Sequence, residues 1–370
     1  MPNSAGASDT PAALDTSLFD YELPPEAIAQ APAAQRDASR LLVVDRARRT
    51  HSHRYFYELP ELLPPGTRFF RNNVSVLPAR LQAQRPTGGA VECLLLRPAV
   101  DQREWWCLLK PGRRLPIGAH FGLPDLFDAE VCEKDEQGRA RVRFELSAGD
   151  SVVDLAHRIG ELPLPHYIER PKGNAPEDRQ RYQTVFADPT HPNAVAAPTA
   201  GLHFTPELLE KLQAEGHAFH DLRLEVGLGT FRPVKTERIE DHPMHSETYH
   251  LSPDTRAALH APDGRLKLAV GTTSLRAIED YFRRGGTDDV DLMQAFTGEA
   301  DIFIYPPEPA FHVDGLITNF HLPRSTLMCL VSAILTPGST DGIEWLKALY
   351  RDALEHGYRF YSYGDAMLIL

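Results

Sequence analysis

Several polar side chains in this sequence stand where acid–base chemistry could occur. A neutral imidazole can accept a proton near pH 7, and a carboxylate beside it can orient the ring or stabilise a cation. Each candidate lies beside small residues or at the end of a predicted strand, where reactive groups are often found. Each could also be an ordinary hydrogen-bonded polar residue. The candidates are His203, His242, His245, Glu247, Asp314 and His321.

Two loops rich in glycine and hydroxyl side chains predict a binding pocket. One loop spans residues 198–204, and the other spans residues 226–234. Glycine lets the backbone approach a ligand closely, and the hydroxyl groups offer hydrogen bonds. A pair of tight turns without a ligand is the alternative interpretation. The residues of interest in these loops are Thr199, Gly201, Gly229, Thr230 and Phe231.

A third polar loop follows a predicted strand at residues 266–270 and leads into a predicted helix. Backbone N–H groups at the start of a helix attract anions, so this loop could bind a phosphate or a carboxylate. It lacks the lysine and the glycine spacing of a P-loop. Ordinary helix capping is the alternative. The residues are Gly271, Thr272, Thr273 and Ser274, followed in the helix by Arg276.

Familiar catalytic and cofactor motifs are missing from the sequence. Residues 227–230 have neither the serine of a nucleophile elbow nor the third glycine of a dinucleotide fingerprint. The four cysteines are scattered, without the paired spacing of a zinc site. His51 and His53 share one face of an extended segment, but two imidazoles with no carboxylate or thiol nearby indicate structural or surface residues. We therefore expect neither a metal nor a cofactor.

Length and composition indicate two domains, or one domain with a large insertion. The chain has 370 residues, of which 42% are hydrophobic, so it can bury a substantial core. Residues 1–17 are rich in Ala, Ser, Asp and Pro and predict a flexible tail. No apolar run reaches the ~20 residues of a membrane span. Scattered cysteines suit a reducing environment, so we expect a soluble, cytoplasmic protein.

The formal net charge of −12 argues against indiscriminate nucleic-acid binding, which needs clustered Lys and Arg. Residues 66–89 are a local exception, because they contain no acidic residue. Arginines there alternate with aromatic and amide side chains, so the segment could contact a polyanion. A solvated β-strand face is the alternative. The candidate contacts are Arg68, Arg71, Asn72, Asn73 and Arg80.

The elements that must position these residues follow an α/β pattern. Thr205 and Pro206 predict the start of a helix. Strands are expected at residues 219–226, 301–305 and 313–318. Because α/β proteins bind ligands at one edge of their sheet, we expect the polar loops to share a rim.

Residues 66–149 differ in pattern from the rest of the chain. Short β-type runs alternate with turns that contain Gly and Pro, and no helical pattern interrupts them. Regular short strands of this kind predict a small antiparallel barrel or sandwich. We expect residues 66–149 to form an inserted β-barrel domain. Residues 18–65 together with 150–370 are expected to form the main α/β domain.

Five collinear segments with unusual residue combinations resemble those of a known family. They are residues 196–204, 241–247, 270–276, 314–326 and 358–367. On these residues the sequence resembles the S-adenosylmethionine:tRNA ribosyltransferase-isomerase family of queuosine biosynthesis. The similarity runs from Phe19 to Met367.

The resemblance implies a fold, a reaction and two substrates. The fold is a distorted, barrel-like α/β domain with a small antiparallel β-barrel inserted. The reaction transfers the ribosyl part of S-adenosylmethionine to 7-aminomethyl-7-deazaguanine (preQ1) at the tRNA wobble position and isomerises it. Epoxyqueuosine tRNA forms, and adenine and methionine leave. S-adenosylmethionine is then a consumed co-substrate rather than a cofactor, tRNA is the partner, and a monomer is expected.

The resemblance also suggests roles for the candidate residues. A sulfonium acidifies the C5′ protons, so His203 or His245 could remove one before the substrate amine attacks the sugar. Glu247 or Asp314 would steady the sulfonium, and residues 66–89 would contact the anticodon loop. The substrate-binding residues would be Thr199, Gly201, Gly229, Thr230, Phe231, Gly271, Thr272, Thr273, Ser274, Arg276, Asn319 and His321.

The sequence departs from the family pattern at two places. The family has Asn-Asp-Thr-Arg-Val where this chain has residues 72–76, so a hydroxyl and an arginine are lost at Val74 and Ser75. Pro307 stands where the family prefers glycine. If the missing arginine contacts tRNA or substrate, affinity falls unless another arginine compensates. A different S-adenosylmethionine-dependent RNA enzyme, such as a methyltransferase, and a non-catalytic tRNA-binding relative are therefore alternatives.

Overall fold

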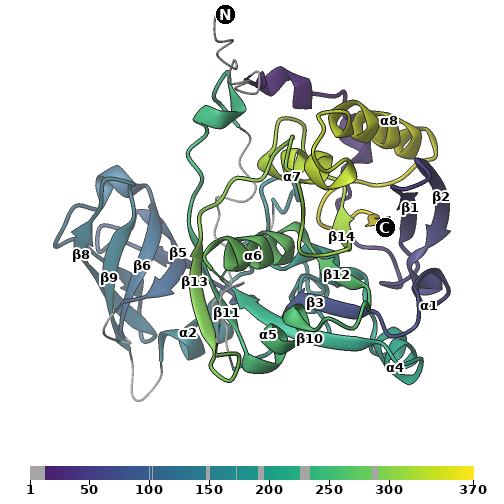
Figure 1. Ribbon diagram of the computed structural model, residues 1–370. Helices are drawn as coiled ribbons and strands as arrows, with labels where there is room; N and C mark the ends of the chain where they lie inside the picture. Colours follow the sequence, from purple (N-terminus) through teal and green to yellow (C-terminus); the bar gives the residue numbers. More distant parts are fainter. Residues whose placement is uncertain are drawn as a thin grey trace, which may run out of the picture.

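The computed structural model describes residues 13–99, 101, 103–146, 151–171, 173–190, 196–225, 234–285 and 291–370. The chain forms two units, a large sheet covered by helices and a separate barrel (Figure 1). The expected pocket residues Gly229, Thr230 and Phe231 lie outside the described residues.

The large unit contains a nine-stranded mixed sheet. In spatial order its strands are β13 (Phe296–Ala300), β11 (Glu247–Leu251), β10 (Ala218–Leu224), β3 (Arg68–Asn72), β12 (Lys267–Val270), β14 (Gly315–Asn319), β15 (Ala366–Ile369), β1 (Arg40–Asp45) and β2 (Thr50–Tyr55). The central strands β10, β3, β12 and β14 are parallel neighbours. β15 runs antiparallel to β14 and parallel to β1. β11, β13 and β2 extend the sheet antiparallel toward its two ends.

The centre of the sheet is buried on both faces, because its strands carry apolar side chains at successive positions. Phe69 and Phe70 of β3 are both fully buried and belong to different cores. On β12, Leu268 belongs to the core that contains Phe69, and Ala269 belongs to the core that contains Phe70. Side chains on a strand alternate between faces, so each central strand helps to build both cores.

Helices cover both faces of the sheet. The core that contains Phe70 also takes in α5 (Pro253–His260), α6 (Thr272–Arg283), α7 (Thr326–Leu335) and α8 (Gly342–Glu355). The core that contains Phe69 takes in α1 (Leu59–Leu62) and α4 (Pro206–Ala214), whose predicted Thr205 cap is confirmed. No helix in the described part of the chain is long and apolar enough to cross a membrane. The shorter helices are α3 (Asp178–Arg181), η1 (Thr16–Phe19), η2 (Pro25–Ala27), η3 (Phe56–Glu58), η4 (Gly112–Arg114), η5 (Thr199–His203) and η7 (Ile239–Asp241).

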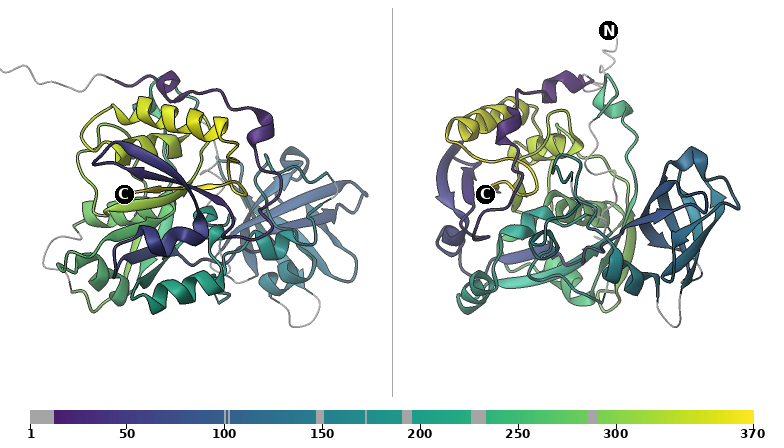
Figure 2. Two further views of the ribbon diagram at one scale, coloured as in Figure 1. Left: turned by 90° about the vertical axis from the view of Figure 1, so that its right-hand side faces the viewer. Right: turned by 180° about the vertical axis from the view of Figure 1, so that it is seen from behind.

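The second unit is a closed antiparallel barrel, which confirms the expected fold class of an α/β protein with a small β-barrel (Figure 2). Around the barrel the strands are β4 (Arg80–Gln84), β5 (Ala90–Pro98), β6 (Glu104–Lys110), β9 (Ala140–Leu146), β8 (Phe127–Lys134) and β7 (His120–Leu123). Alternate residues of β9, such as Val142 and Phe144, are fully buried in its interior. Leu155 of α2 (Val152–Ile159) adds to the same core.

The chain enters and leaves the barrel unit at one place, the pair Arg80 and Glu161, which we call the neck. The N–H of Arg80 donates to the carbonyl of Glu161 (3.0 Å), and the N–H of Glu161 donates to the carbonyl of Arg80 (2.9 Å). Gly160 fits tightly beside them, because a Cβ atom there would lie 1.9 Å from the carbonyl oxygen of Pro78. The barrel is therefore an insertion whose two ends meet.

Two strand expectations differ from the structure. Residues 68–72, which the sequence grouped with the barrel, form β3 at the centre of the large sheet. Their pattern fits either unit, and their partners β10 and β12 are distant in sequence, so local patterns could not assign them. Residues 301–305 form no strand, because the neighbouring residues of β13 pair with β11 instead.

Candidate active site

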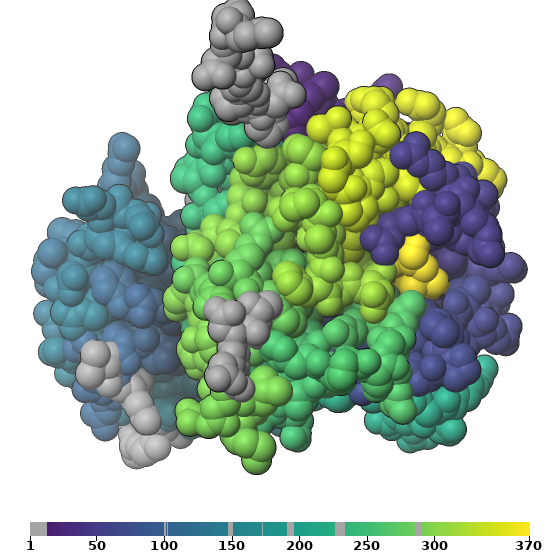
Figure 3. Space-filling view, in the orientation of Figure 1, coloured from purple at the N-terminus to yellow at the C-terminus, as the bar shows by residue number. Residues whose placement is uncertain are grey.

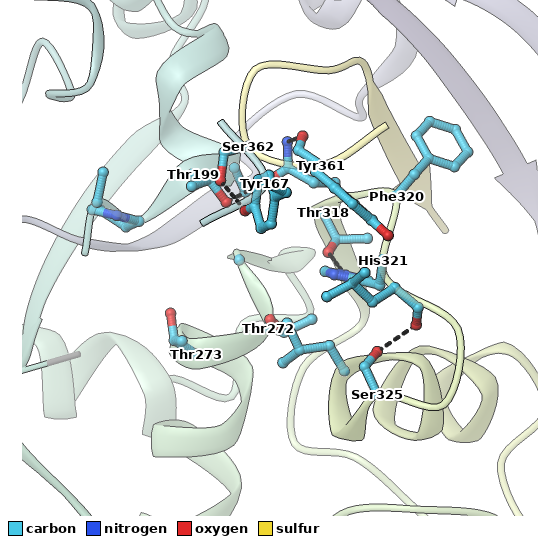
Figure 4. Close-up of a pocket in the computed structure, with 17 residues that line it drawn as sticks. Tyr167, Thr199, Thr272, Thr273, Thr318, Phe320, His321, Ser325, Tyr361 and Ser362 are labelled. Carbon is cyan, nitrogen blue, oxygen red and sulfur yellow. Dashed lines mark hydrogen bonds between the residues drawn. The ribbon is translucent and has the colours of Figure 1, made fainter. Parts of the chain in front are cut away.

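A hollow opens at the edge of the large sheet where β12 and β14 end. We call it the main hollow. Helices α6 and α7 begin beside it, as the labelled residues in Figure 4 show. The carboxyl ends of parallel strands are a usual place for ligands in α/β folds. Its polar and aromatic residues are Tyr167, Thr199, Thr272, Thr273, Thr318, Asn319, Phe320, His321, Ser325, Tyr361 and Ser362.

The start of α6 forms one side of the main hollow. Gly271 precedes the helix with φ +92° and ψ 146°, a conformation that residues with side chains rarely adopt. Thr272 and Thr273 then line the hollow. The hydroxyl of Ser274 instead donates to the carbonyl of Val270 (2.8 Å) and is fully buried. The loop therefore brings its two threonines to the hollow but not Ser274.

The end of β14 and the start of α7 form another side. Ser325 caps α7 by accepting from the N–H of Met328 (3.2 Å), and its hydroxyl donates to the carbonyl of Leu322 (2.7 Å). Oγ1 of Thr318 lies 2.8 Å from Nε2 of His321. Burial lowers the pKa of His321 to about 3, so its ring is neutral at pH 7. His321 thus lines the hollow as a neutral polar group.

A series of hydrogen bonds connects the main hollow with the interior. The hydroxyl of Thr199 donates to Oδ1 of Asn319 (2.8 Å), which leaves Nδ2 of Asn319 to donate to Nε2 of His203 (3.1 Å). Nε2 is therefore unprotonated, and Nδ1 of His203 donates to Oγ of Ser39 (2.8 Å). These bonds hold the amide of Asn319 in the wall of the hollow.

His203 lies behind that wall rather than in it. Only 4% of the residue is exposed, and its ring stacks on Phe56 with the ring centroids 5.1 Å apart. Burial lowers the pKa of His203 to about 3, and the positive charges of Arg359 and Arg36 act in the same direction. Both ring nitrogens are bonded within the protein. The structure therefore favours a role in which His203 positions Asn319.

A second hollow adjoins the main one, and the two share Thr272, Thr273 and Leu327. His245 and Glu247 line it. Nε2 of His245 lies 3.4 Å from Oε1 of Glu247, and 31% of the histidine side chain is exposed. Among the candidate bases described, His245 combines a carboxylate partner with access to a hollow.

Arg276 also lines the second hollow, where it holds Glu247 in place. Its Nη1 donates to Oε2 of Glu247 (3.0 Å), and both side chains are buried. Burial lowers the pKa of Arg276, and the negative charge of Glu247 opposes that shift. Nη2 of the same guanidinium group donates to the backbone carbonyls of His245 and Ala300, and Nε donates to that of Ile302. Arg276 is thus bound within the protein and fixes the orientation of the carboxylate.

Besides Ser274 and His203, two further expected site residues do not reach either hollow. Asp314 precedes β14, so it lies at the opposite end of that strand from Asn319, and its carboxylate accepts from the N–H of Lys267 (2.7 Å). The expectation that Asp314 steadies a bound sulfonium therefore does not fit its position. Gly201 serves close packing, because a Cβ atom there would lie 2.6 Å from the ring of Phe186.

The expected tRNA contacts on β3 are engaged within the protein. Arg68 forms a two-pronged ion pair with Asp263 (2.7 and 2.6 Å), and Arg71 pairs with Asp221 (2.7 Å). Asn72 is buried, and both ends of its amide bond to the backbone of β10. A phosphate would therefore have to compete with carboxylates for these arginines.

The segment between β3 and the barrel contains the other two expected contacts and the departures from the family pattern. Asn73 is half-buried, and Arg80 lies in the neck, 3.9 Å from Glu92. Val74 is fully buried, and Oγ of Ser75 accepts from Nε2 of Gln183 (2.8 Å). The positions that lack the family's threonine and arginine thus face the interior.

Several residues of the main hollow carry no clear signal in the sequence. The rings of Tyr167 and Tyr361 lie 4.6 Å apart, and the hydroxyl of Tyr167 lies 2.6 Å from that of Ser362. Tyr361 has φ +72°, an uncommon conformation for a bulky residue that often marks a functional site. Backbone strain cannot be seen in a sequence. In the sequence, the signal that could have pointed to Tyr361 and Ser362 is the family resemblance of residues 358–367.

A family model and several curated proteins are similar to this chain over nearly its whole length. A family model described as queuosine biosynthesis protein matches residues 16–369. The S-adenosylmethionine:tRNA ribosyltransferase-isomerase of Gloeobacter violaceus is 47% identical over 360 residues, which cover 96% of this chain and 96% of the relative. The chain belongs to this family. The ribosyltransferase-isomerase of Thermotoga maritima is 42% identical over 96% of this chain and 100% of its own length.

A solved structure of a ribosyltransferase is similar as well. The crystal structure of S-adenosylmethionine tRNA ribosyltransferase from Thermotoga maritima, at 2.00 Å resolution, matches with a TM-score of 0.53. Its sequence is 35% identical, and the match covers 96% of this chain and 100% of that one. The resemblance found in the five segments is thereby confirmed, and the chain is an enzyme of the ribosyltransferase-isomerase family.

Proposed function

We propose that this protein transfers and isomerises the ribosyl part of S-adenosylmethionine onto 7-aminomethyl-7-deazaguanine at the wobble position of tRNA. The products are epoxyqueuosine tRNA, adenine and methionine, so S-adenosylmethionine is consumed and is not a cofactor. One observation carries the proposal. On one side of Thr272 and Thr273 is a wall of aromatic rings and hydroxyl groups, and on the other side is the pair His245 and Glu247.

The main hollow suits the adenosyl and carboxylate parts of S-adenosylmethionine. Tyr167 and Tyr361 offer flat apolar faces to a purine. The start of α6 at Thr272 and Thr273 offers backbone N–H groups to the methionine carboxylate, because the positive end of a helix dipole favours an anion.

His245 is the base in this proposal. The positive sulfonium makes the adjoining C5′ protons acidic, and Nδ1 of His245 takes one of them. Glu247 lies on the Nε2 side and stabilises the imidazolium that results. Arg276 holds the second carboxylate oxygen of Glu247, which fixes the pair before substrate binds. The amine of the deazaguanine then attacks the activated sugar, and the bonds from the sugar to adenine and to the methionine sulfur break during the reaction, so that both groups leave.

The tRNA is the proposed macromolecular partner, and we propose that the protein acts as a cytoplasmic monomer. The proposed contact surface is residues 66–89, which contain no acidic residue. Two of its arginines already pair with carboxylates, so tRNA binding there would exchange those ion pairs for phosphate contacts. Such binding weakens as salt concentration rises, because phosphate contacts release counterions.

The products of the reaction test the proposal. Purified protein is incubated with S-adenosylmethionine and tRNA that carries the deazaguanine precursor, and products are identified by mass spectrometry. We expect free adenine and epoxyqueuosine. Methylated RNA without adenine would indicate a methyltransferase instead. Tight tRNA binding without S-adenosylmethionine binding in calorimetry would indicate a non-catalytic relative.

A pair of variants tests the base. His245→Gln removes the imidazole that meets Glu247, and we expect adenine release to fall about 100-fold or more. His250→Gln is the matched control, because His250 lies on β11, the strand that carries Glu247, and bonds to Thr297 outside both hollows. Adenine release at the wild-type rate from the His245 variant would rule out this base.

A further inference from the structure

We propose that His51, His53 and Asp352 form a binding site for a divalent first-row transition-metal ion such as Zn²⁺, away from both hollows. His51 and His53 belong to β2, the end strand of the large sheet, and Asp352 belongs to α8. Figure 1 shows β2 and α8 on the side of the molecule opposite the barrel. In Figure 3 the purple atoms of β1 and β2 meet the yellow atoms of α8. The sequence separates the carboxylate from the histidines, so only the fold brings the three together.

The geometry is close to that of a metal centre. His51 and His53 are two positions apart on a strand, so both rings leave the same face. Nε2 of His51 lies 3.1 Å from Oδ2 of Asp352, and Nε2 of His53 lies 3.2 Å from the same oxygen. One ligand atom from each residue can be chosen so that all lie within 4.8 Å of one another. Ligand atoms on a tetrahedral Zn²⁺ are about 3.3 Å apart, so small side-chain movements would suffice.

Neighbouring groups hold the ligands in the orientation that a metal needs. Nδ1 of His53 lies 3.1 Å from the hydroxyl of Tyr358, so Nδ1 can keep its proton while Nε2 faces the site. The ring of His356 stacks on that of His53 with the ring centroids 4.1 Å apart. Nδ1 of His356 donates to the carbonyl of Asp352 (2.9 Å). Outer contacts of this kind fix tautomer and ring orientation in metal sites.

The charges also favour a cation of this class. Two imidazoles and one carboxylate suit Zn²⁺ and its neighbours better than Mg²⁺ or Ca²⁺, which prefer oxygen ligands alone. About a third of each side chain is exposed, so solvent can fill the remaining coordination position. A bound ion would tie the end strand β2 to α8.

Calorimetry with Zn²⁺ tests the site. The untagged full-length protein is stripped with EDTA, dialysed and titrated with ZnCl2. We expect one ion to bind per chain and to raise Tm. His51→Gln and Asp352→Asn should each weaken Zn²⁺ binding about tenfold or more. His120→Gln is the matched control, because His120 pairs with Asp128 in the barrel without a second histidine.

The outcomes separate a metal site from a plain hydrogen-bonded cluster. Circular dichroism and Tm without metal establish that each variant is folded. The proposal is supported if the His51 and Asp352 variants lose both Zn²⁺ binding and the Zn²⁺-dependent rise in Tm while the His120 variant keeps them. No stoichiometric binding of Zn²⁺ to the wild type, or an affinity for Zn²⁺ in both site variants equal to that of the wild type, would overturn it. Adenine release is not part of this test, so the proposal stands or falls independently of the proposed function.

Discussion

At the scale of single residues, burial separates the histidines of the site by their readiness to take a proton. His203 and His321 are buried, and in each the pKa is lowered to about 3. His245 is partly exposed and faces Glu247. A base must exchange a proton with its substrate, so the buried rings suit positioning and His245 suits proton transfer.

The two buried histidines should make the protein less stable in acid. Their folded pKa of about 3 lies below the unfolded value of 6.5, so the unfolded state binds more protons as pH falls through this window. When the pH is lowered from 7 to 5, each histidine should reduce the free energy of unfolding by about 2 kcal/mol. Urea unfolding at the two pH values measures the difference.

Removing one of these histidines should make stability less sensitive to acid. In His203→Gln, the decrease in the free energy of unfolding between pH 7 and pH 5 should be about 2 kcal/mol smaller than in the wild type. His157→Gln is the control, because His157 is an exposed residue of α2. If the free energy of unfolding falls as much between pH 7 and pH 5 in the His203 variant as in the wild type, this account is contradicted.

The sequence predicts which residues belong to the site better than it predicts where their side chains point. Thr199, Thr272 and Asn319 reach the main hollow as expected, because each stands at a helix start or a strand end. Asp314 does not, because it precedes its strand and lies at the other edge of the sheet. The direction of His203 depends on contacts with distant segments, which no local pattern contains.

At the scale of elements, Gly271 links β12 to α6. Its φ of +92° is strained for any other residue, yet a Cβ atom there would meet its nearest neighbours at an ordinary 3.7 Å. Gly271→Ala should therefore destabilise the protein by about 1–3 kcal/mol through backbone strain alone. We also expect weaker S-adenosylmethionine binding, because relief of the strain would move the start of α6. Urea unfolding and calorimetry measure the two effects.

Gly112→Ala is the matched control for this substitution. Gly112 has no atom within 4 Å of a built Cβ, and its φ is not in the left-handed region. Its replacement should change neither stability nor ligand binding by a measurable amount. Equal effects of the two substitutions would show that strain at Gly271 is not what matters.

Helix starts were easier to predict than strand partners. The cap at Thr205 depends on a hydrogen bond to a residue three positions on, so a short stretch of sequence contains all the information. The place of β3 depends on pairing with β10 and β12, which come much later in the chain. Pairing of that kind is decided by the whole fold.

At the scale of the whole molecule, the two hollows belong to the sheet unit alone. Every residue that lines them lies outside the insertion between Arg80 and Glu161. The sequence favoured a separate β unit over residues 66–149, because a run of short strands without helices differs from an α/β pattern. It could not show that the insertion closes at the neck, because that contact joins residues far apart in the chain.

The neck predicts that the sheet unit folds without the barrel. Arg80 and Glu161 already bond to each other as a close antiparallel pair, so two glycines in place of residues 81–160 can join them. We expect the shortened chain to keep its circular dichroism per residue in the helical region and to bind S-adenosylmethionine as the full chain does. A folded product that no longer binds S-adenosylmethionine would show that the barrel supports the hollows.

The neck also bears on how the polypeptide reaches its native state. The parallel neighbours β3 and β10 are separated in the chain by the whole barrel, and loop closure across so long a segment costs entropy. If the barrel forms first from its own hairpins, its two ends come together and the remaining loop becomes much shorter. The insertion would then delay the pairing of β3 with β10 much less than its length suggests.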